Sequence, residues 1–254
     1  MTRRARPLLV CLLAGLLAAC ASVPPGARDP RDPWESWNRA VFRFNTELDK
    51  AVVKPVVKTY QRITPDVVES AVTNFFANLR DVGIFFNDLL QGKFAAAGTD
   101  AGRLVMNTTL GLGGLFDIAT EAGLTKHDED FGQTLGRWGA DPGPYLMLPL
   151  LGPSTLRDTG GLLVDYALDP VNWLRDHQAR LALRTLDLMD ARSRALKVEE
   201  VFGGGFYDPY EVLRDAYLKR RAVLVSDGAE IEAAGPDEEM IRELEELEGP
   251  DAPP

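Results

Sequence analysis

The sequence has little of the chemistry from which most active sites are built. Only two of its 254 residues are cysteines and only two are histidines. His127 and His177 lie far apart in the chain, so a catalytic triad or a zinc site would depend on the fold to bring them together. Cys11 and Cys20 both lie near the N-terminus, which leaves the rest of the chain without a disulfide or a cysteine-based metal site. We therefore expect a protein that is not an enzyme and that uses no metal and no cofactor.

Three stretches look reactive but have simpler interpretations. Residues 127–130 read His-Asp-Glu-Asp, which is more typical of a solvated loop than of a metal site, with Asp130 capping the next helix together with Gln133. Ser154 is predicted to be the N-cap of a helix over 155–168. The glycines of residues 110–117 follow no predicted strand and precede no Lys-Ser/Thr pair, so they indicate a helix break with close packing rather than a nucleotide loop.

The apolar run nearest the N-terminus is too short to span a membrane. It covers the 12 residues 8–19, whereas a spanning helix needs about 20. Three arginines precede it and small residues end it directly before Cys20, which is typical of a secretory signal and resembles the lipobox of bacterial lipoproteins. We expect residues 1–19 to be a signal peptide, Cys20 to be acylated, and residues 20–31 to be a linker. Residues 21–22 lack the Asp that commonly retains such lipoproteins at the inner membrane, so the expected location is the inner leaflet of the outer membrane.

Basic clusters are also missing. The net charge is −10, and residues 226–254 alone carry 11 acidic residues against one arginine. The acidic character therefore belongs to a C-terminal tail that we expect to be largely disordered. The chain offers no positive surface suited to nucleic acid.

Helix-start signals, in contrast, are abundant. Asp-Pro or Thr-Pro pairs occur at Asp32, Thr64, Asp169 and Asp208, each placing a capping side chain before a proline in the first helical turn. Alternating β-type patterns are few, so the sequence predicts an all-α body over residues 32–225 as a single domain. The expected helices cover residues 33–53, 65–80, 81–90, 93–109, 155–168, 181–202 and 209–225, and Gly92 is expected to close the third of them.

The first of these helices has one aromatic-rich stripe, which includes Trp34, Trp37 and Phe44. Two interpretations remain open. The stripe packs against the protein core, or the helix lies flat in the membrane interface soon after the lipid anchor, with its aromatic side chains facing the membrane.

Several motifs, in one order along the chain, resemble the MlaA (VacJ) lipoprotein family. They are DPWESWNR at residues 32–39, NFFANLR at 74–80, NDLLQGK at 87–93, NTTLGLGGLFD at 107–117, EDFGQTLG at 129–136, GPY at 143–145 and LPLLGPS at 148–154. The resemblance covers roughly residues 32–221 and leaves the acidic tail out.

The resemblance implies a ring of helices that lies in the inner leaflet of the outer membrane around an amphipathic channel. Members of the family take mislocalised phospholipid from the outer leaflet and pass it to a soluble periplasmic carrier of the Mla pathway, and some associate with trimeric porins. Residues 139–143, with Gly139, Asp141 and Gly143, would form a flexible loop near the channel, and Tyr145 would begin an apolar wall beside it. Asp141-Pro142 makes this loop stiffer than in many family members.

Two other classes of function stay open at this stage. A purely structural or porin-anchoring lipoprotein would release no lipid to a carrier. A lipid-cleaving enzyme would produce lysophospholipid and would depend on a single acid, base or serine.

If Cys20 carries the anchor, the Cys20→Ser variant should be unacylated and lost from the outer membrane, because several acyl chains bind a bilayer stably whereas an amphipathic helix alone binds weakly. Fractionation of cell envelopes measures this loss. Normal outer-membrane fractionation of the variant would contradict the anchor assignment.

Overall fold

The computed structural model describes residues 29–202 and 208–229. The signal peptide, Cys20, the first part of the linker and residues 230–254 of the tail lie outside these ranges. The elements, in order, are α2 (Glu35–Leu48), the π-helical turn η2 (Asp49–Val53), α3 (Lys54–Ile63), α4 (Asp66–Gln91), α5 (Phe94–Thr109), α6 (Ile118–Glu121), α7 (Phe131–Arg137), β1 (Tyr145–Leu148), β2 (Gly152–Thr155), α8 (Leu156–Leu168), the 3₁₀ turn η3 (Pro170–Trp173), α9 (His177–Phe202) and α10 (Pro209–Val225).

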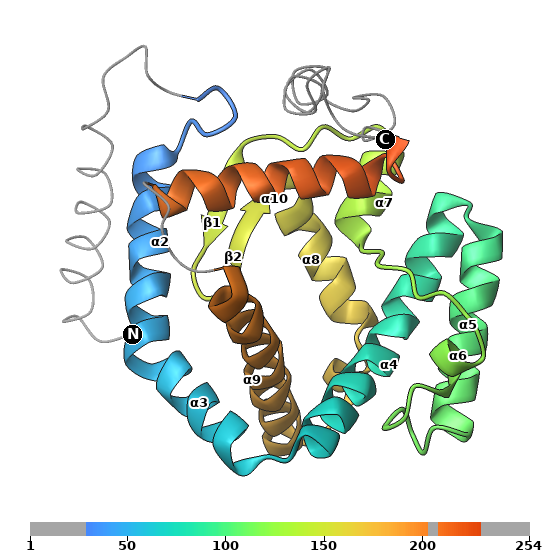
Figure 1. The fold of residues 1–254 in the computed structure, drawn as a ribbon. Helices are drawn as coiled ribbons and strands as arrows, with labels where there is room; N and C mark the ends of the chain where they lie inside the picture. Colours follow the sequence, from blue (N-terminus) through green and yellow to red (C-terminus); the bar gives the residue numbers. More distant parts are fainter. Residues whose placement is uncertain (1–28, 203–207, 230–254) are drawn as a thin grey trace, which may run out of the picture.

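These elements close into a ring (Figure 1). The chain runs through α2 and α3 into α4, which contacts α7. Helix α7 contacts α10, and α10 contacts β2. The circuit closes because β1, the partner of β2, packs on α2. Helix α9 contacts both α3 and α4, and α8 contacts α7 and β2. The α5–α6 unit lies outside this circuit and packs against α4. The all-α prediction is confirmed, with one small exception in the β1–β2 hairpin.

The helical arc from α2 to α3 is continuous, whereas the sequence predicted a helix that ended near Val53. Pro55 lies in the first turn of α3 and has no N–H to donate, so it would interrupt an ordinary helix. A π-helical turn over Asp49–Val53 absorbs this defect. The turn is also held from outside, because the Asp49 carboxylate accepts two hydrogen bonds from Arg192 of α9 at 2.8 and 2.7 Å. The helix thereby continues around the ring.

Helix α4 is a single helix of 26 residues, so the predicted break at Asp81 is wrong. Asp81 was the first residue of the helix predicted over residues 81–90, but it is buried within α4 and forms an ion pair with Lys126. The predicted end at Gly92 is confirmed, since Gly92 adopts the left-handed conformation, with φ of +77°, that closes many helices.

Helix caps were predicted with mixed success. Asp208 and Asp130 accept hydrogen bonds from the backbone of the following turn, as expected. Ser154 is not the cap of α8; it belongs to β2, and Thr155 accepts the bond from the Asp158 N–H instead. Asp32 does not cap α2 either. Its carboxylate lies fully buried between α2 and α10, where it accepts hydrogen bonds from Asn38 and from the Tyr210 hydroxyl.

Two asparagines attach the β1 strand to α2. The buried Asn38 side chain accepts a hydrogen bond from the Met147 N–H at 2.8 Å and donates to the Tyr145 carbonyl at 3.1 Å. One heptad later, Asn45 donates to the Leu148 carbonyl and accepts from the Leu150 N–H, both at 2.9 Å. One edge of β1 is therefore hydrogen-bonded to β2, and the other edge is hydrogen-bonded to side chains of α2. This arrangement joins the beginning of the ring to its end.

The acidic tail does not begin abruptly after α10. Asp227 forms ion pairs with Lys93 and Arg137, so the first tail residues contact the body. Residue 225 is therefore the end of helix α10, but the tail still contacts the ring beyond this residue.

We predict that Asn38→Ala lowers the free energy of unfolding by at least ~2 kcal/mol, because it leaves the Met147 N–H, the Tyr145 carbonyl and part of the Asp32 carboxylate buried without a partner. Asn45→Ala should lower it by clearly less, since Asn45 is only partly buried. Urea unfolding in detergent measures both values. Equal losses would show that the buried bonds have no special role.

Candidate functional site

The burial pattern of the protein is inverted relative to a soluble domain. Among the described residues, 12 apolar side chains are buried, compared with 19 polar or charged ones, while 30 large apolar side chains are exposed. The exposed set includes Phe44, Ile63, Phe94, Leu112 and Leu163, from elements spread over the ring. We call these 30 exposed apolar side chains the apolar rim. A soluble monomer rarely exposes so much apolar surface, so the apolar rim indicates an apolar partner. No described helix combines the length and the apolarity needed to cross a bilayer.

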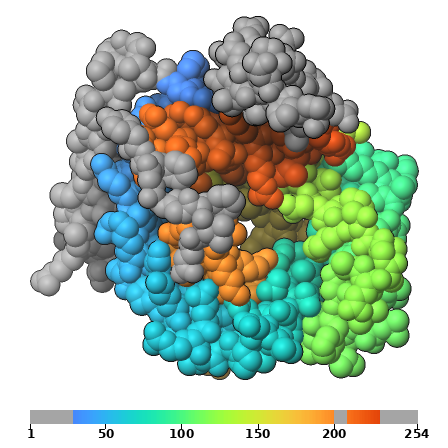
Figure 2. Space-filling model, viewed as in Figure 1, coloured from blue at the N-terminus to red at the C-terminus, as the bar shows by residue number. Residues whose placement is uncertain are grey.

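The centre of the ring is hollowed. Figure 2 shows an opening bordered by α4, α7 and α10, with the α8 region visible inside it. The helices around it are held by buried polar contacts: Thr134 of α7 donates to Asn87 of α4, and Asp165 of α8 accepts from the Phe131 N–H and from Asn87. These hydrogen bonds join α4, α7 and α8 to one another beside the opening.

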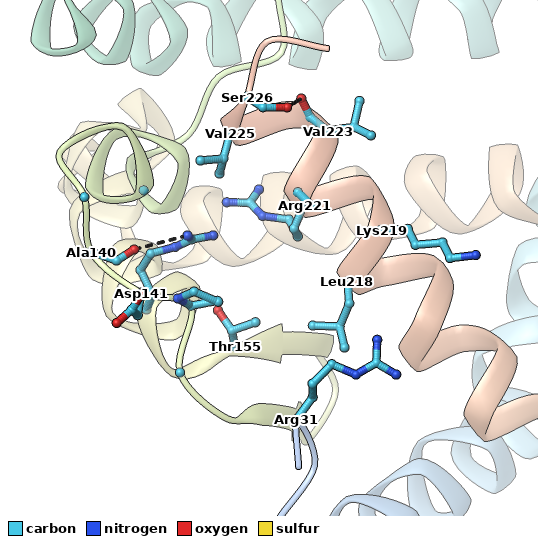
Figure 3. Close-up of a pocket in the computed structure, with 16 residues that line it drawn as sticks. Arg31, Ala140, Asp141, Thr155, Leu218, Lys219, Arg221, Val223, Val225 and Ser226 are labelled. Atoms are coloured by element: carbon cyan, nitrogen blue, oxygen red, sulfur yellow. Dashed lines mark hydrogen bonds between the residues drawn. The ribbon is translucent and has the colours of Figure 1, made fainter. Parts of the chain in front are cut away.

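A separate pocket of about 800 Å³ lies between residues 139–143, the start of α8 and the C-terminal half of α10 (Figure 3). Gly139, Asp141 and Gly143 all line it. Gly139 and Gly143 have φ of +90° and +66°, a region that residues with a Cβ rarely adopt. A Cβ on Gly143 would also come within 3.2 Å of the Leu156 side chain. The sequence placed these three residues in one loop, and the structure places that loop at a cavity.

Backbone hydrogen bonds hold the loop of residues 139–143 in place. The Arg157 N–H donates to the Pro142 carbonyl and the Leu156 N–H to the Pro144 carbonyl, both at 3.1 Å. These bonds fix the end of the loop to the first turn of α8. The start of the loop is held to α7, because the Gly139 N–H donates to the Gly136 carbonyl and the Ala140 N–H to the Leu135 carbonyl, both at 2.9 Å. Arg157 adds a 3.4 Å bond to the Ala140 carbonyl.

Tyr145 was predicted to begin a wall beside the channel, and the structure contradicts this. Its side chain is fully buried with Val41, Met147 and Tyr210 in the apolar core cluster between α2, β1 and α10. The strand alternates burial, so every second side chain of β1 points into the core. The exposed apolar residues of this segment are instead Leu150 and Leu151, at the tip of the hairpin.

The aromatic stripe of α2 divides between the two interpretations. Trp34 and Phe44 are 44% and 54% exposed, so they contribute to the apolar rim. Trp37 is partly buried and packs against the core cluster, and its assignment as a membrane-facing residue stays a prediction.

One side of the pocket is a buried charge network that sequence analysis missed. Arg221 of α10 donates to Asp130 at 2.9 Å and to Asp158 of α8 at 3.0 Å, and Tyr217 donates to Asp158 at 2.8 Å. Burial alone would raise the pKa of Asp130, but the Arg221 guanidinium outweighs burial and lowers it. The network joins α7, α8 and α10. Asp130 could be recognised in the sequence as a helix cap, but its partner lies 91 residues away.

Residues with catalytic potential do not assemble around the pocket. Ser154 is buried and bonds the Thr159 hydroxyl at 2.9 Å, His127 bonds Asp100 at 2.7 Å, and His177 lies beside Arg180. In the described part of the chain, no hydrogen bond joins Ser154 to a histidine.

Comparison with protein families decides the relationship. A profile of the MlaA lipoprotein family matches residues 30–224. The chain belongs to the MlaA lipoprotein family. The resemblance predicted from the motifs is thereby confirmed.

Named relatives support the same assignment. The intermembrane phospholipid transport system lipoprotein MlaA of Escherichia coli K12 is 31% identical to this chain, over 90% of the chain and 92% of its own length. The protein of the same name in Haemophilus influenzae is 29% identical, over 91% and 94%. One solved structure is described as the "structural basis for maintenance of bacterial outer membrane lipid asymmetry". It is 31% identical to this chain and superposes with a TM-score of 0.68. The match covers 78% of this chain and 100% of the solved chain.

We predict that Arg221→Met destabilises this MlaA family member by about 2 kcal/mol, because it removes charged hydrogen bonds to the partly exposed Asp130 and to the buried Asp158, which keeps its ion pair with Arg157. Arg220→Met is the matched control: Arg220 pairs with Asp128 at an exposed site, and loss of such a pair costs about 0–1 kcal/mol. Thermal unfolding in detergent compares the two variants. Equal shifts would mean that the Arg221 network adds nothing to stability.

Proposed function

We propose that this protein is anchored by an acylated Cys20 in the inner leaflet of the outer membrane, where its ring takes phospholipid that has reached the outer leaflet and passes it, uncleaved, to a soluble periplasmic carrier. Named family members are lipoproteins of an intermembrane phospholipid transport system. The observation that carries the proposal for this chain is the inverted burial pattern, with a polar interior and an apolar rim.

The rim fits a lipid environment energetically. Complete transfer of a Val, Leu or Phe side chain out of water contributes about 1.5–3 kcal/mol, so each half-exposed side chain of the rim would contribute on the order of 1 kcal/mol. With 30 such side chains in the described residues, even partial immersion gives a large total. The same surface in water would cause aggregation.

The dimensions suit one leaflet. A helix with its side chains is ~10–12 Å thick, and half of a bilayer's hydrocarbon core is about 15 Å. A ring whose helices lie in the plane of the membrane would therefore fit within a single leaflet without a spanning helix. In this position the central opening would connect the periplasm with the middle of the bilayer.

The function of such a ring is to lower a barrier rather than to perform a reaction. A lipid headgroup that enters hydrocarbon without partners costs several kcal/mol for each polar group. An amphipathic opening, as the family resemblance implies, would give the headgroup partners while the acyl chains stay in apolar surroundings. This requires no nucleophile, and it sets no direction, so the net movement has to come from the carrier that binds the lipid downstream.

The transport proposal is tested with liposomes that contain the mature lipoprotein and a labelled phospholipid. We expect the intact lipid to appear on the soluble carrier. Absence of transfer from correctly folded protein would favour a structural or porin-associated lipoprotein, and release of lysophospholipid would favour an enzyme.

Within this function, we predict that the shape of residues 139–143 controls the transfer rate. Gly139→Val should slow transfer although a side chain there meets open space, because φ of +90° is strained for a branched residue by roughly 1 kcal/mol or more. Gly139→Asn should transfer lipid at close to the normal rate, because Asn tolerates positive φ. Gly143→Val should be slower still, since it adds contact with Leu156.

Ser154→Ala and His177→Ala serve as controls and should transfer lipid normally, while a thermal melt identifies any variant that has simply unfolded. If folded Gly139→Val transfers lipid as fast as the unaltered protein and Ser154→Ala transfers none, the passage is not controlled by this loop and catalysis at Ser154 becomes the better explanation.

A further inference from the structure

Two buried carboxylates and a histidine meet where α4, α5 and the segment before α7 come together. They are Asp88 of α4, Asp100 of α5 and His127, and one ligating atom from each lies within 4.8 Å of the others. The closest pair is His127 Nδ1 and Asp100 Oδ2, at 2.7 Å. The sequence placed His127 beside Asp128 and Glu129, but the fold brings it to acids 27 and 39 positions earlier in the chain.

Most of the carboxylate oxygens in this cluster have no protein partner. Asp88 and Asp100 are both fully buried. Neither oxygen of Asp88 accepts a hydrogen bond, and Oδ1 of Asp100 accepts none. A buried charged group left without a partner is costly, so an arrangement with three such oxygens facing one histidine needs a neutralising group.

The neighbouring cations are engaged with other acids. Lys93 Nζ lies 2.7 Å from Glu129 and also pairs with Asp227, while Lys126 pairs with Asp81. Arg103, buried on α5, holds Asp117 at 2.9 Å. Among the described residues, none of these three cations forms an ion pair with Asp88 or Asp100.

We propose that Asp88, Asp100 and His127 bind one Zn²⁺ ion. Two carboxylate oxygens and one imidazole nitrogen form a mixed oxygen–nitrogen ligand set that zinc accepts, whereas Mg²⁺ and Ca²⁺ prefer oxygen ligands alone. The His127 side chain is 32% exposed, so a cation can reach the cluster from the surface and a water molecule can complete a tetrahedral site.

The consequence of this site is mechanical. Helix α5 packs chiefly against α4 and α6 and lies outside the ring circuit. A metal ion bound to Asp88 and Asp100 would join α4 to α5, and His127 would add the segment that leads to α7. The α5–α6 unit, with exposed Phe94 and Val105, would thereby be fixed in orientation relative to the ring.

The test uses the mature lipoprotein, purified in detergent with a tag that contains no histidine, treated with a chelator and then titrated with Zn²⁺. We expect one Zn²⁺ per chain by calorimetry and elemental analysis, and a rise in melting temperature that the chelator reverses. Mg²⁺ at the same concentration should produce neither effect.

Asp88→Asn and His127→Ala should each weaken Zn²⁺ binding by at least the ~10–100-fold that loss of an outer-shell partner causes. His177→Ala is the matched control, because it removes the other histidine of the chain, which lies beside Arg180 on α9, and it should bind Zn²⁺ normally. Asp88→Asn keeps the size of the side chain, so it decides the question if His127→Ala does not fold.

The proposal is overturned if the unaltered protein binds no stoichiometric Zn²⁺, or if Asp88→Asn binds it as tightly as the unaltered protein does. A melting temperature that ignores Zn²⁺ but rises as the pH is lowered from 8 to 6 would identify a proton shared by Asp88 and Asp100 as the neutralising group. Neither result would bear on lipid transfer, which is measured separately.

Discussion

Hydrogen bonds between buried or partly buried polar side chains and the backbone of neighbouring elements hold this fold together. Asn38 and Asn45 bind the edge of β1, Asn107 accepts from the Ala119 N–H, and Asp165 accepts from the Phe131 N–H. If the ring lies in lipid, as we propose, apolar contacts between its helices give little cohesion, whereas a polar group in such surroundings has to find its partner within the protein. The apolar surroundings therefore account both for the burial of polar side chains and for the exposure of apolar ones.

Small residues allow this polar framework to be compact. A Cβ on Gly161 of α8 would meet the backbone of Gly132 of α7 at 2.6 Å, so these two helices cross backbone to backbone. Their contact lies beside the network of Arg221, Asp130 and Asp158. Close crossings and buried ion pairs leave no room for rearrangement.

Rigidity is distributed unevenly around the molecule. The α2–β1–α10 junction combines the apolar core cluster with the Asp32 and Asn38 bonds. The α5–α6 unit depends on its contacts with α4, and these contain the carboxylates Asp81, Asp88 and Asp100. Whether this second junction is firm therefore depends on what neutralises its charge. The α2–β1–α10 junction and the α4–α5 junction therefore differ in the interactions that stabilise them.

The sequence by itself determined the features that depend on neighbours a few positions away. The Asp208 and Asp130 caps, the left-handed Gly92, the helical class and the family motifs could all be recognised because their partners lie within one or two helical turns. Only the tertiary structure decided the roles of residues whose partners are remote. Asp32 looked like a helix cap but bonds Tyr210, 178 positions later; Asp81 looked like a helix start but pairs with Lys126; and Tyr145 looked like channel wall but is core. In each case the local pattern was compatible with two environments. Long-range packing selected between them, because the energy of a buried charge or ring depends on what surrounds it in space.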